Sequence, residues 1–205
     1  MTERRMEMSR EMATRTKESA EITVYLAGPE VFLPDAAPVV EEMRRLCREH
    51  GLTPIAPLDA GVDDEVDGGA GGAGGMSAAA GGAPDPAWIF EKNVSRIRAS
   101  DAVIANVNHF RGSEPDSGTC FELGYAHALG KKLYVYSDDG ATAVDRVREF
   151  YGPVDEVAGK RPTDPEGTFV ENFGYAVNLM MAVPAVTVNG TFADAVKVAS
   201  TDLLE

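Results

Sequence analysis

Four short apolar runs alternate with segments of helical pattern, and this alternation restricts the fold more than any other feature of the chain. The runs contain many β-branched residues and end near Gly, Pro or Asn, which is typical of buried strands. They comprise residues 22–27, 52–56, 101–107 and 133–136. Because a helical segment follows each strand, the order predicts an α/β fold with a doubly wound parallel sheet and right-handed crossovers.

The predicted helices are recognised by apolar spacing and by their end signals. Asp85 and Pro86 are suited to the N-cap and first turn of a helix that runs to about Ser100. The other predicted helices comprise residues 38–50, 116–130, 168–181 and 192–204, whereas residues 138–167 are polar and are predicted to form loops.

The length of 205 residues predicts one domain, residues 21–205, with a core large enough to need no disulfide or metal. Residues 1–20 alternate acidic and basic side chains and are predicted to form a flexible tail. Residues at about 59–86 are rich in Gly, Ala and Asp and contain few bulky apolar side chains. This Gly-rich insertion is predicted to be a mobile surface loop, either disordered or acting as a lid.

The charge balance excludes several classes of partner. The chain has 33 acidic against 19 basic residues, a formal net charge of -14. Such an acidic protein is not expected to bind a nucleic acid polymer or an anionic membrane surface. No apolar run has the length of a membrane span, and the N-terminus lacks the apolar core of a signal peptide. We therefore expect a cytoplasmic protein, in keeping with two cysteines that form no disulfide framework.

The motifs that usually bind cofactors are missing from the sequence. No GxGxxG follows the first predicted strand, and the chain has no phosphate-binding loop with Gly-Lys-Ser or Gly-Lys-Thr. The three histidines, His50, His109 and His127, do not have the spacing of metal ligands. We expect no cofactor and no metal. Cys120 lies near His127 but is interpreted as a small buried thiol.

Glu122 lacks a local partner of opposite charge. Its helical neighbours three and four positions away are uncharged, namely Gly118, Thr119, Tyr125 and Ala126. A carboxylate among such neighbours is costly unless a ligand or a reaction uses it. The alternative is a structural ion pair with a distant arginine, such as Arg96 or Arg111.

Three polar segments follow predicted strands and are expected to meet. Residues 28–30, 106–108 and 116–122 all come after strand ends, where ligands bind in a doubly wound sheet. Asp116 is equally suited to capping the helix that begins at Ser117, and capping is compatible with catalysis. Tyr25 and Asn93 have alternative interpretations as a core aromatic and an exposed helix residue.

The chain resembles the nucleoside 2-deoxyribosyltransferases over about residues 22–182. The resemblance is carried by Tyr25-Leu26-Ala27-Gly28-Pro29, Asp101-Ala102-Val103-Ile104-Ala105-Asn106, Asp116-Ser117-Gly118-Thr119, Glu122-Leu123-Gly124-Tyr125-Ala126 and Asn178-Leu179-Met180. It implies a flavodoxin-like, three-layer α/β/α fold and a homo-oligomer whose sites are shared between subunits. The substrates implied are a deoxynucleoside and a free nucleobase, as in nucleotide salvage.

The resemblance also implies the roles of individual residues. Glu122 is implied as the nucleophile, and Asp116 as the residue that serves the departing base and the sugar. Asn178 and Met180 are implied to reach a neighbouring subunit's site. The remaining implied substrate-binding residues are Tyr25, Gly28, Pro29, Asn93, Asn106, Ser117 and Gly118. Asn93 stands where some family members have Asp, and the Gly-rich insertion has no counterpart.

The expected reaction is retaining transfer of a 2-deoxyribosyl group between nucleobases through a covalent glycosyl-glutamate intermediate. Such a reaction requires a carboxylate at the anomeric carbon and an acid for the leaving group. Two alternatives remain open. One is an N-glycoside hydrolase of deoxynucleosides or deoxynucleoside 5′-monophosphates, and the other is a nucleotide-sensing module without catalysis.

Overall fold

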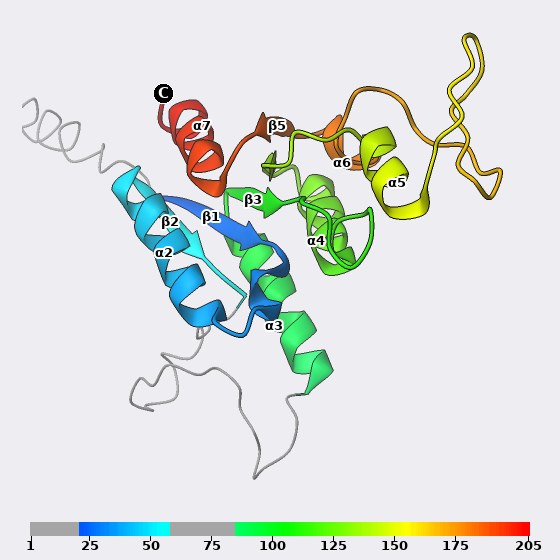
Figure 1. The fold of residues 1–205 in the computed structure, drawn as a ribbon. Coiled ribbons are helices and arrows are strands. Elements are labelled where there is room, and N and C mark those ends of the chain that lie inside the picture. The colour runs from blue at the N-terminus through cyan, green and yellow to red at the C-terminus, as the bar shows by residue number, and fades with distance from the viewer. Residues whose placement is uncertain (1–20, 58–84) are drawn as a thin grey trace, which may run out of the picture.

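A five-stranded parallel sheet forms the centre of the protein (Figure 1). The computed structural model describes residues 21–57 and 85–205. The strand order within the described part is β2-β1-β3-β4-β5, and every neighbouring pair is parallel. The strands are β1 (Ile22–Ala27), β2 (Leu52–Ile55), β3 (Ala102–Asn106), β4 (Lys132–Ser137) and β5 (Val186–Asn189). This is the order of a doubly wound, flavodoxin-like sheet, so the predicted fold class is confirmed.

Helices cover both faces of the sheet and give three layers. Side chains of α2 (Ala36–Glu49) and α7 (Phe192–Leu204) share one core cluster with Val24 and Leu26. Side chains of α3 (Pro86–Ala99) and α4 (Ser117–Ala128) share a second cluster with Tyr25 and Ala27. Successive β1 residues therefore point to opposite faces, and both faces are buried, as a parallel sheet requires.

The helix ends follow the signals read from the sequence. The Asp85 side chain accepts a hydrogen bond from the Ala87 backbone N–H at the start of α3. Gly51 and Gly130, which follow α2 and α4, both have positive φ angles, of 77° and 72°. Glycine adopts this left-handed conformation without the steric cost that a Cβ would add.

The predictions for the C-terminal third were partly wrong. Residues 168–181 do not form a helix, because Phe169 pairs with Thr163 in an isolated antiparallel bridge and Gly174 has a φ of 78°. The described helix there is the short α6 (Leu179–Ala182). A helix, α5 (Ala143–Tyr151), forms instead within the predicted loop, where Thr142 and Asp145 make a reciprocal capping box. β5 was not predicted.

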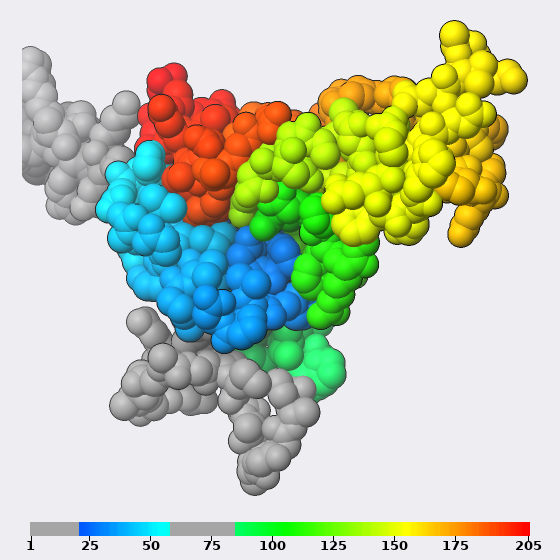
Figure 2. Space-filling view, viewed as in Figure 1, coloured from blue at the N-terminus to red at the C-terminus, as the bar shows by residue number. Residues whose placement is uncertain are grey.

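The segment between α5 and α6 projects from one side of the molecule, as the yellow and orange atoms in Figure 2 show. Phe169 and Phe173 lie in it, and both are 64% exposed. Their apolar spacing therefore does not correspond to a buried helical face in this chain. The predicted tail, residues 1–20, and nearly all of the insertion at about 59–86 lie outside the described residues.

Candidate active site

The chain changes direction between β1 and β3, and this change places the candidate site. From β1 the chain continues through α2 to the outer strand β2, whereas from β3 it continues through α4 to β4 on the opposite side. The two crossovers diverge at the carboxyl ends of β1 and β3. Such a switch point leaves a crevice in which ligands of doubly wound proteins bind.

Glu122 faces this edge from the second turn of α4. The Tyr25 hydroxyl, on the fully buried β1 side chain, donates a hydrogen bond of 2.5 Å to Glu122 Oε1. The pKa of Glu122 is raised to about 7, chiefly by burial and in smaller part by the negative charge of Asp116, although the Tyr25 hydrogen bond lowers it. Burial and the Glu122 charge also raise the pKa of Tyr25. Tyr25 therefore remains a donor while Glu122 exchanges its proton near neutral pH.

No ion pair of Glu122 is found within residues 21–57 and 85–205, which argues against the alternative of a structural arginine partner. Arg96 donates from Nη1 to the Pro57 carbonyl oxygen, at 2.7 Å, and to Asn93 Oδ1, at 3.1 Å. The guanidinium of Arg111 lies 4.7 Å from the ring centroid of Phe110. Within the described residues, no cation is therefore among the causes that set the pKa of Glu122.

Asp116 caps α4 and also acts on Glu122. Its Oδ2 accepts a hydrogen bond of 3.0 Å from the Thr119 backbone N–H, as an N-cap does. Its Oδ1 accepts no hydrogen bond from the part of the chain that the structure describes. Ser117 and Gly118 form the exposed first turn, and a Cβ at position 118 would lie 2.9 Å from Asp116 Oδ2. Capping therefore uses one oxygen and leaves the other available for chemistry.

Gly28 and Asn106 come together where β1 and β3 end. A Cβ at position 28 would lie 3.0 Å from Asn106 Cβ and 2.0 Å from Glu30 Oε2, so a larger side chain at Gly28 would displace Glu30. Asn106 donates from Nδ2 to Glu30 Oε1 at 2.6 Å and accepts from the Asn108 backbone N–H at 2.9 Å. Pro29 begins the short 3-10 helix η1 (Pro29–Phe32). Both polar atoms of Asn106 are thus engaged within the protein.

The other expected substrate-binding residues lie apart from this group or on its border. Asn93, on α3, is partly buried and accepts from Arg96. Asn178 caps α6 and donates from Nδ2 to Glu171 Oε1 at 2.9 Å. Met180 is 76% exposed. None of the contacts within the described part of the chain joins Asn178 or Met180 to Glu122.

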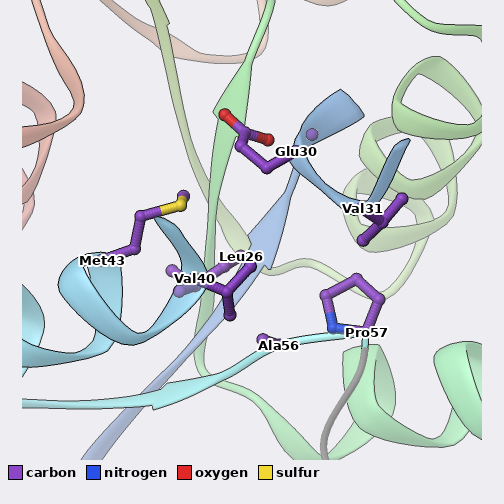
Figure 3. Close-up of a pocket in the computed structure, with 8 residues that line it drawn as sticks. Leu26, Glu30, Val31, Val40, Met43, Ala56 and Pro57 are labelled. Atoms are coloured by element: carbon purple, nitrogen blue, oxygen red, sulfur yellow. The ribbon is translucent and has the colours of Figure 1, made fainter. Parts of the chain in front are cut away.

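Glu30 was expected at this edge from the sequence, but no role was predicted for it. Its Oε1 accepts hydrogen bonds from Asn106 Nδ2 and, at 3.1 Å, from the Tyr136 hydroxyl of β4. Figure 3 shows the Glu30 carboxyl group pointing away from the apolar pocket formed by Leu26, Val40 and Pro57. The feature of the sequence that could have indicated a role for Glu30 is its position directly after Gly28-Pro29. Its contact with Tyr136 could not be predicted, because Tyr136 resembles any core residue of a buried strand.

Within the described residues, no group of three or more His, Cys, Asp or Glu side chains is arranged to hold a metal ion. The described helices also include none with the length and apolar character needed to cross a bilayer.

Comparison with known proteins places this arrangement in a family. The family model described as nucleoside 2-deoxyribosyltransferase matches residues 24–180, which include β1, β3, α4 and the Asn178 segment. The chain belongs to this family. The match covers both Glu122 and Tyr25, which form the hydrogen-bonded pair at the β1 and β3 edge.

Two solved structures and one curated protein are similar to this chain. A 2-deoxyribosyltransferase from Leishmania mexicana is 35% identical, covers 88% of this chain and 97% of its own, and superposes with a TM-score of 0.61. An enzyme of the same name from Bacillus psychrosaccharolyticus is 20% identical, over 60% of this chain and 81% of its own, with a TM-score of 0.41. An uncharacterised protein of Schizosaccharomyces pombe is 32% identical over 128 residues, 62% of this chain. The chain spans 55% of that relative's length.

Proposed function

We propose that this protein transfers a 2-deoxyribosyl group from one nucleobase to another, with Glu122 as the nucleophile. The observation that carries the proposal is the partly buried Glu122, whose pKa is raised to about 7 and whose described contacts include the Tyr25 hydroxyl but no cation. The family match and the name of the Leishmania relative support the same reaction.

In the proposed first step, ionised Glu122 attacks the anomeric carbon of the deoxynucleoside. The carbon–oxygen bond to Glu122 forms as the bond from carbon to the base nitrogen breaks, and the departing base takes up a proton. Asp116, whose negative charge raises the pKa of Glu122, is near the reacting carboxylate and is proposed to relay this proton from solvent to the base through Oδ1, the oxygen that does not cap α4.

In the proposed second step, a nitrogen of the incoming base attacks the same carbon and releases Glu122. The incoming base loses a proton, so the proton balance of the two steps is zero. Two displacements at one carbon restore its configuration, which is retention. The Tyr25 hydroxyl favours the ionised form of Glu122 through its hydrogen bond and so stabilises the carboxylate as a leaving group.

We further propose that the sites are shared between copies of the chain. Asn178 and Met180 make no described contact with Glu122 of their own chain, and Met180 is 76% exposed. Phe169 and Phe173 on the same projecting segment are also largely exposed. A second copy that covers this segment would bury these side chains. Asn178 and Met180 of the first copy would then lie at Glu122 of the second copy. A monomer at assay concentration, by analytical ultracentrifugation, would contradict the shared site.

The reaction is tested by incubating the protein with deoxyinosine and free adenine and separating the products by chromatography. The expected products are deoxyadenosine and hypoxanthine. Glu122→Ala is expected to abolish the exchange, whereas Glu49→Ala, which removes an exposed carboxylate at the end of α2, is expected to preserve it.

Other products would identify other functions. Free deoxyribose without any need for adenine would show a hydrolase, and deoxyribose phosphate from deoxyinosine monophosphate would show a nucleotide hydrolase. Tight nucleotide binding without product would show a sensing module. Exchange that survives in Glu122→Ala would overturn the proposed nucleophile.

A further inference from the structure

Glu30 occupies the crevice edge on the opposite side of the sheet from Glu122. Tyr25, the partner of Glu122, belongs to the core cluster on the α3 and α4 face. Tyr136, a partner of Glu30, belongs to the cluster on the α2 and α7 face. The two carboxylates thus flank the ends of β1 and β3, and a ligand in the crevice would meet one on each side.

The protein holds the Glu30 carboxylate through one of its two oxygens. Oε1 accepts from Asn106 Nδ2 at 2.6 Å and from the Tyr136 hydroxyl at 3.1 Å, while Oε2 accepts no hydrogen bond within the described chain. Oε2 lies against the Cα of Gly28, where the Cβ of any other residue would be 2.0 Å away. Residues from β3, β4 and the end of β1 therefore combine to fix one carboxylate and to leave one oxygen unpaired.

A fixed carboxylate oxygen accepts hydrogen bonds and repels anions. The sugar hydroxyls are the donors of such a bond that every deoxynucleoside shares, whatever N–H groups its base carries. We propose that Glu30 is a substrate-binding residue, whose Oε2 accepts a hydrogen bond from a deoxyribose hydroxyl group. Asn106 is then a positioning residue that acts through Glu30. This inference rests on the proposed function, because it takes the ligand to be a deoxynucleoside.

The test measures binding separately from turnover. Deoxyinosine is titrated calorimetrically into Glu122→Ala protein, which is not expected to consume it, and into the same protein with Glu30→Gln added. Loss of a charge-assisted hydrogen bond is expected to weaken binding about tenfold or more. The amide keeps the size of the side chain, and thermal unfolding of both proteins checks that the fold is retained.

Analogues of the sugar distinguish a contact from a structural role. The 3′-deoxy and 5′-deoxy forms of deoxyinosine each lack one hydroxyl, and the one that lacks the contacted group is expected to bind equally well with and without Glu30→Gln. Tyr136→Phe, which removes one of the two donors to Oε1, is expected to show the same selectivity with a smaller factor. Glu49→Gln, an equal charge change at the opposite edge of the sheet, is expected to leave all three affinities unchanged.

An equal loss on all three ligands, no loss, or no binding of any of them would each overturn the inference. The exchange assay on the unaltered protein is read separately. Exchange without any selective effect of Glu30→Gln would contradict the role of Glu30 alone. Selective binding without exchange or hydrolysis would contradict the proposed reaction alone.

Discussion

Glu122 and Asp139 are both partly buried carboxylates near the carboxyl edge of the sheet, and their surroundings differ in charge. Arg146, which is 1% exposed, lies 3.0 Å from Asp139 Oδ2. Burial alone would raise the pKa of Asp139, but hydrogen bonds from the Ala141 backbone N–H, Ser137 and Arg146 lower it overall. Glu122 receives its hydrogen bond from neutral Tyr25, and its pKa is raised.

The difference separates a structural carboxylate from a reactive one. Arg146 also donates to the Val107 carbonyl oxygen at 2.9 Å and to Ser137 Oγ at 2.7 Å, so the Asp139 group ties β3, β4 and α5 together. Glu122 connects Tyr25 to α4 through a hydrogen bond, but its pKa stays close to neutral pH. We therefore expect changes at Glu122 to reduce activity and changes at Asp139 to reduce stability.

The largest expected effect is the loss of activity in Glu122→Gln. The amide keeps the shape of the side chain but cannot form the glycosyl ester, so exchange is expected to fall more than about a thousandfold. The rate of deoxyadenosine formation measures the loss. A loss below tenfold would contradict a nucleophilic Glu122 and would remove the contrast with Asp139.

The second effect is the loss of stability in Asp139→Asn. Without the carboxylate, the buried guanidinium of Arg146 loses its ion-pair partner, which is expected to cost about 3 kcal/mol of the free energy of unfolding. Urea denaturation at pH 8 measures it. Asp145→Asn, a change at an exposed carboxylate on α5, the helix that carries Arg146, is the control and is expected to cost about 1 kcal/mol through its capping box. Equal costs for the two variants would show that the ion pair of Asp139 with Arg146 stabilises the fold no more than an exposed carboxylate does.

The third effect is the pH dependence of activity. Because the nucleophile must be ionised, kcat/KM is expected to rise with pH through about 7, the pKa of Glu122. Tyr25→Phe removes the hydrogen bond that lowers this pKa, so its profile is expected to shift to higher pH. A profile of unchanged midpoint in Tyr25→Phe would contradict the coupling of the two side chains.

Stability is expected to respond to pH in the opposite direction at Glu122. The folded protein holds a proton on Glu122 between its ordinary pKa of 4.5 and about 7, where the unfolded chain has released it. The stability that this proton contributes is therefore lost as pH rises through that window, by up to about 3 kcal/mol. The free energy of unfolding of Glu122→Gln, relative to that of the unaltered protein, is therefore expected to be higher at pH 8 than at pH 5. Urea denaturation at both values checks the sign, and a gain that is equal at the two would contradict it.

The smallest expected effect separates the two roles of Asp116. Asn caps a helix about as well as Asp, whereas Ala does not, so Asp116→Ala is expected to cost about 1 kcal/mol of stability and Asp116→Asn almost nothing. If Asp116 also serves the departing base, both variants are expected to lose exchange activity to a similar extent. Full activity in Asp116→Asn would leave capping as the role of Asp116.

The C-terminal segments show where sequence patterns failed. Residues 168–181 have apolar side chains at helical spacing, yet Phe169 and Phe173 are exposed and the chain there forms bridges and turns. Local spacing indicates an amphipathic segment but not what covers its apolar side. In contrast, β1 and β3 were predicted closely, because burial on both faces of a parallel sheet leaves continuous apolar runs in the sequence.

The sequence by itself determined the alternating α/β order, the lack of a local partner for Glu122 and the capping signal at Asp116, because these depend on residues a few positions apart. Tertiary structure decided the partners. The pairing of Tyr25 with Glu122 joins residues 97 positions apart, and that of Glu30 with Tyr136 joins residues 106 apart. Such contacts leave no periodic pattern in the sequence, because they depend on strand order and on the register that brings Gly28 beside Asn106.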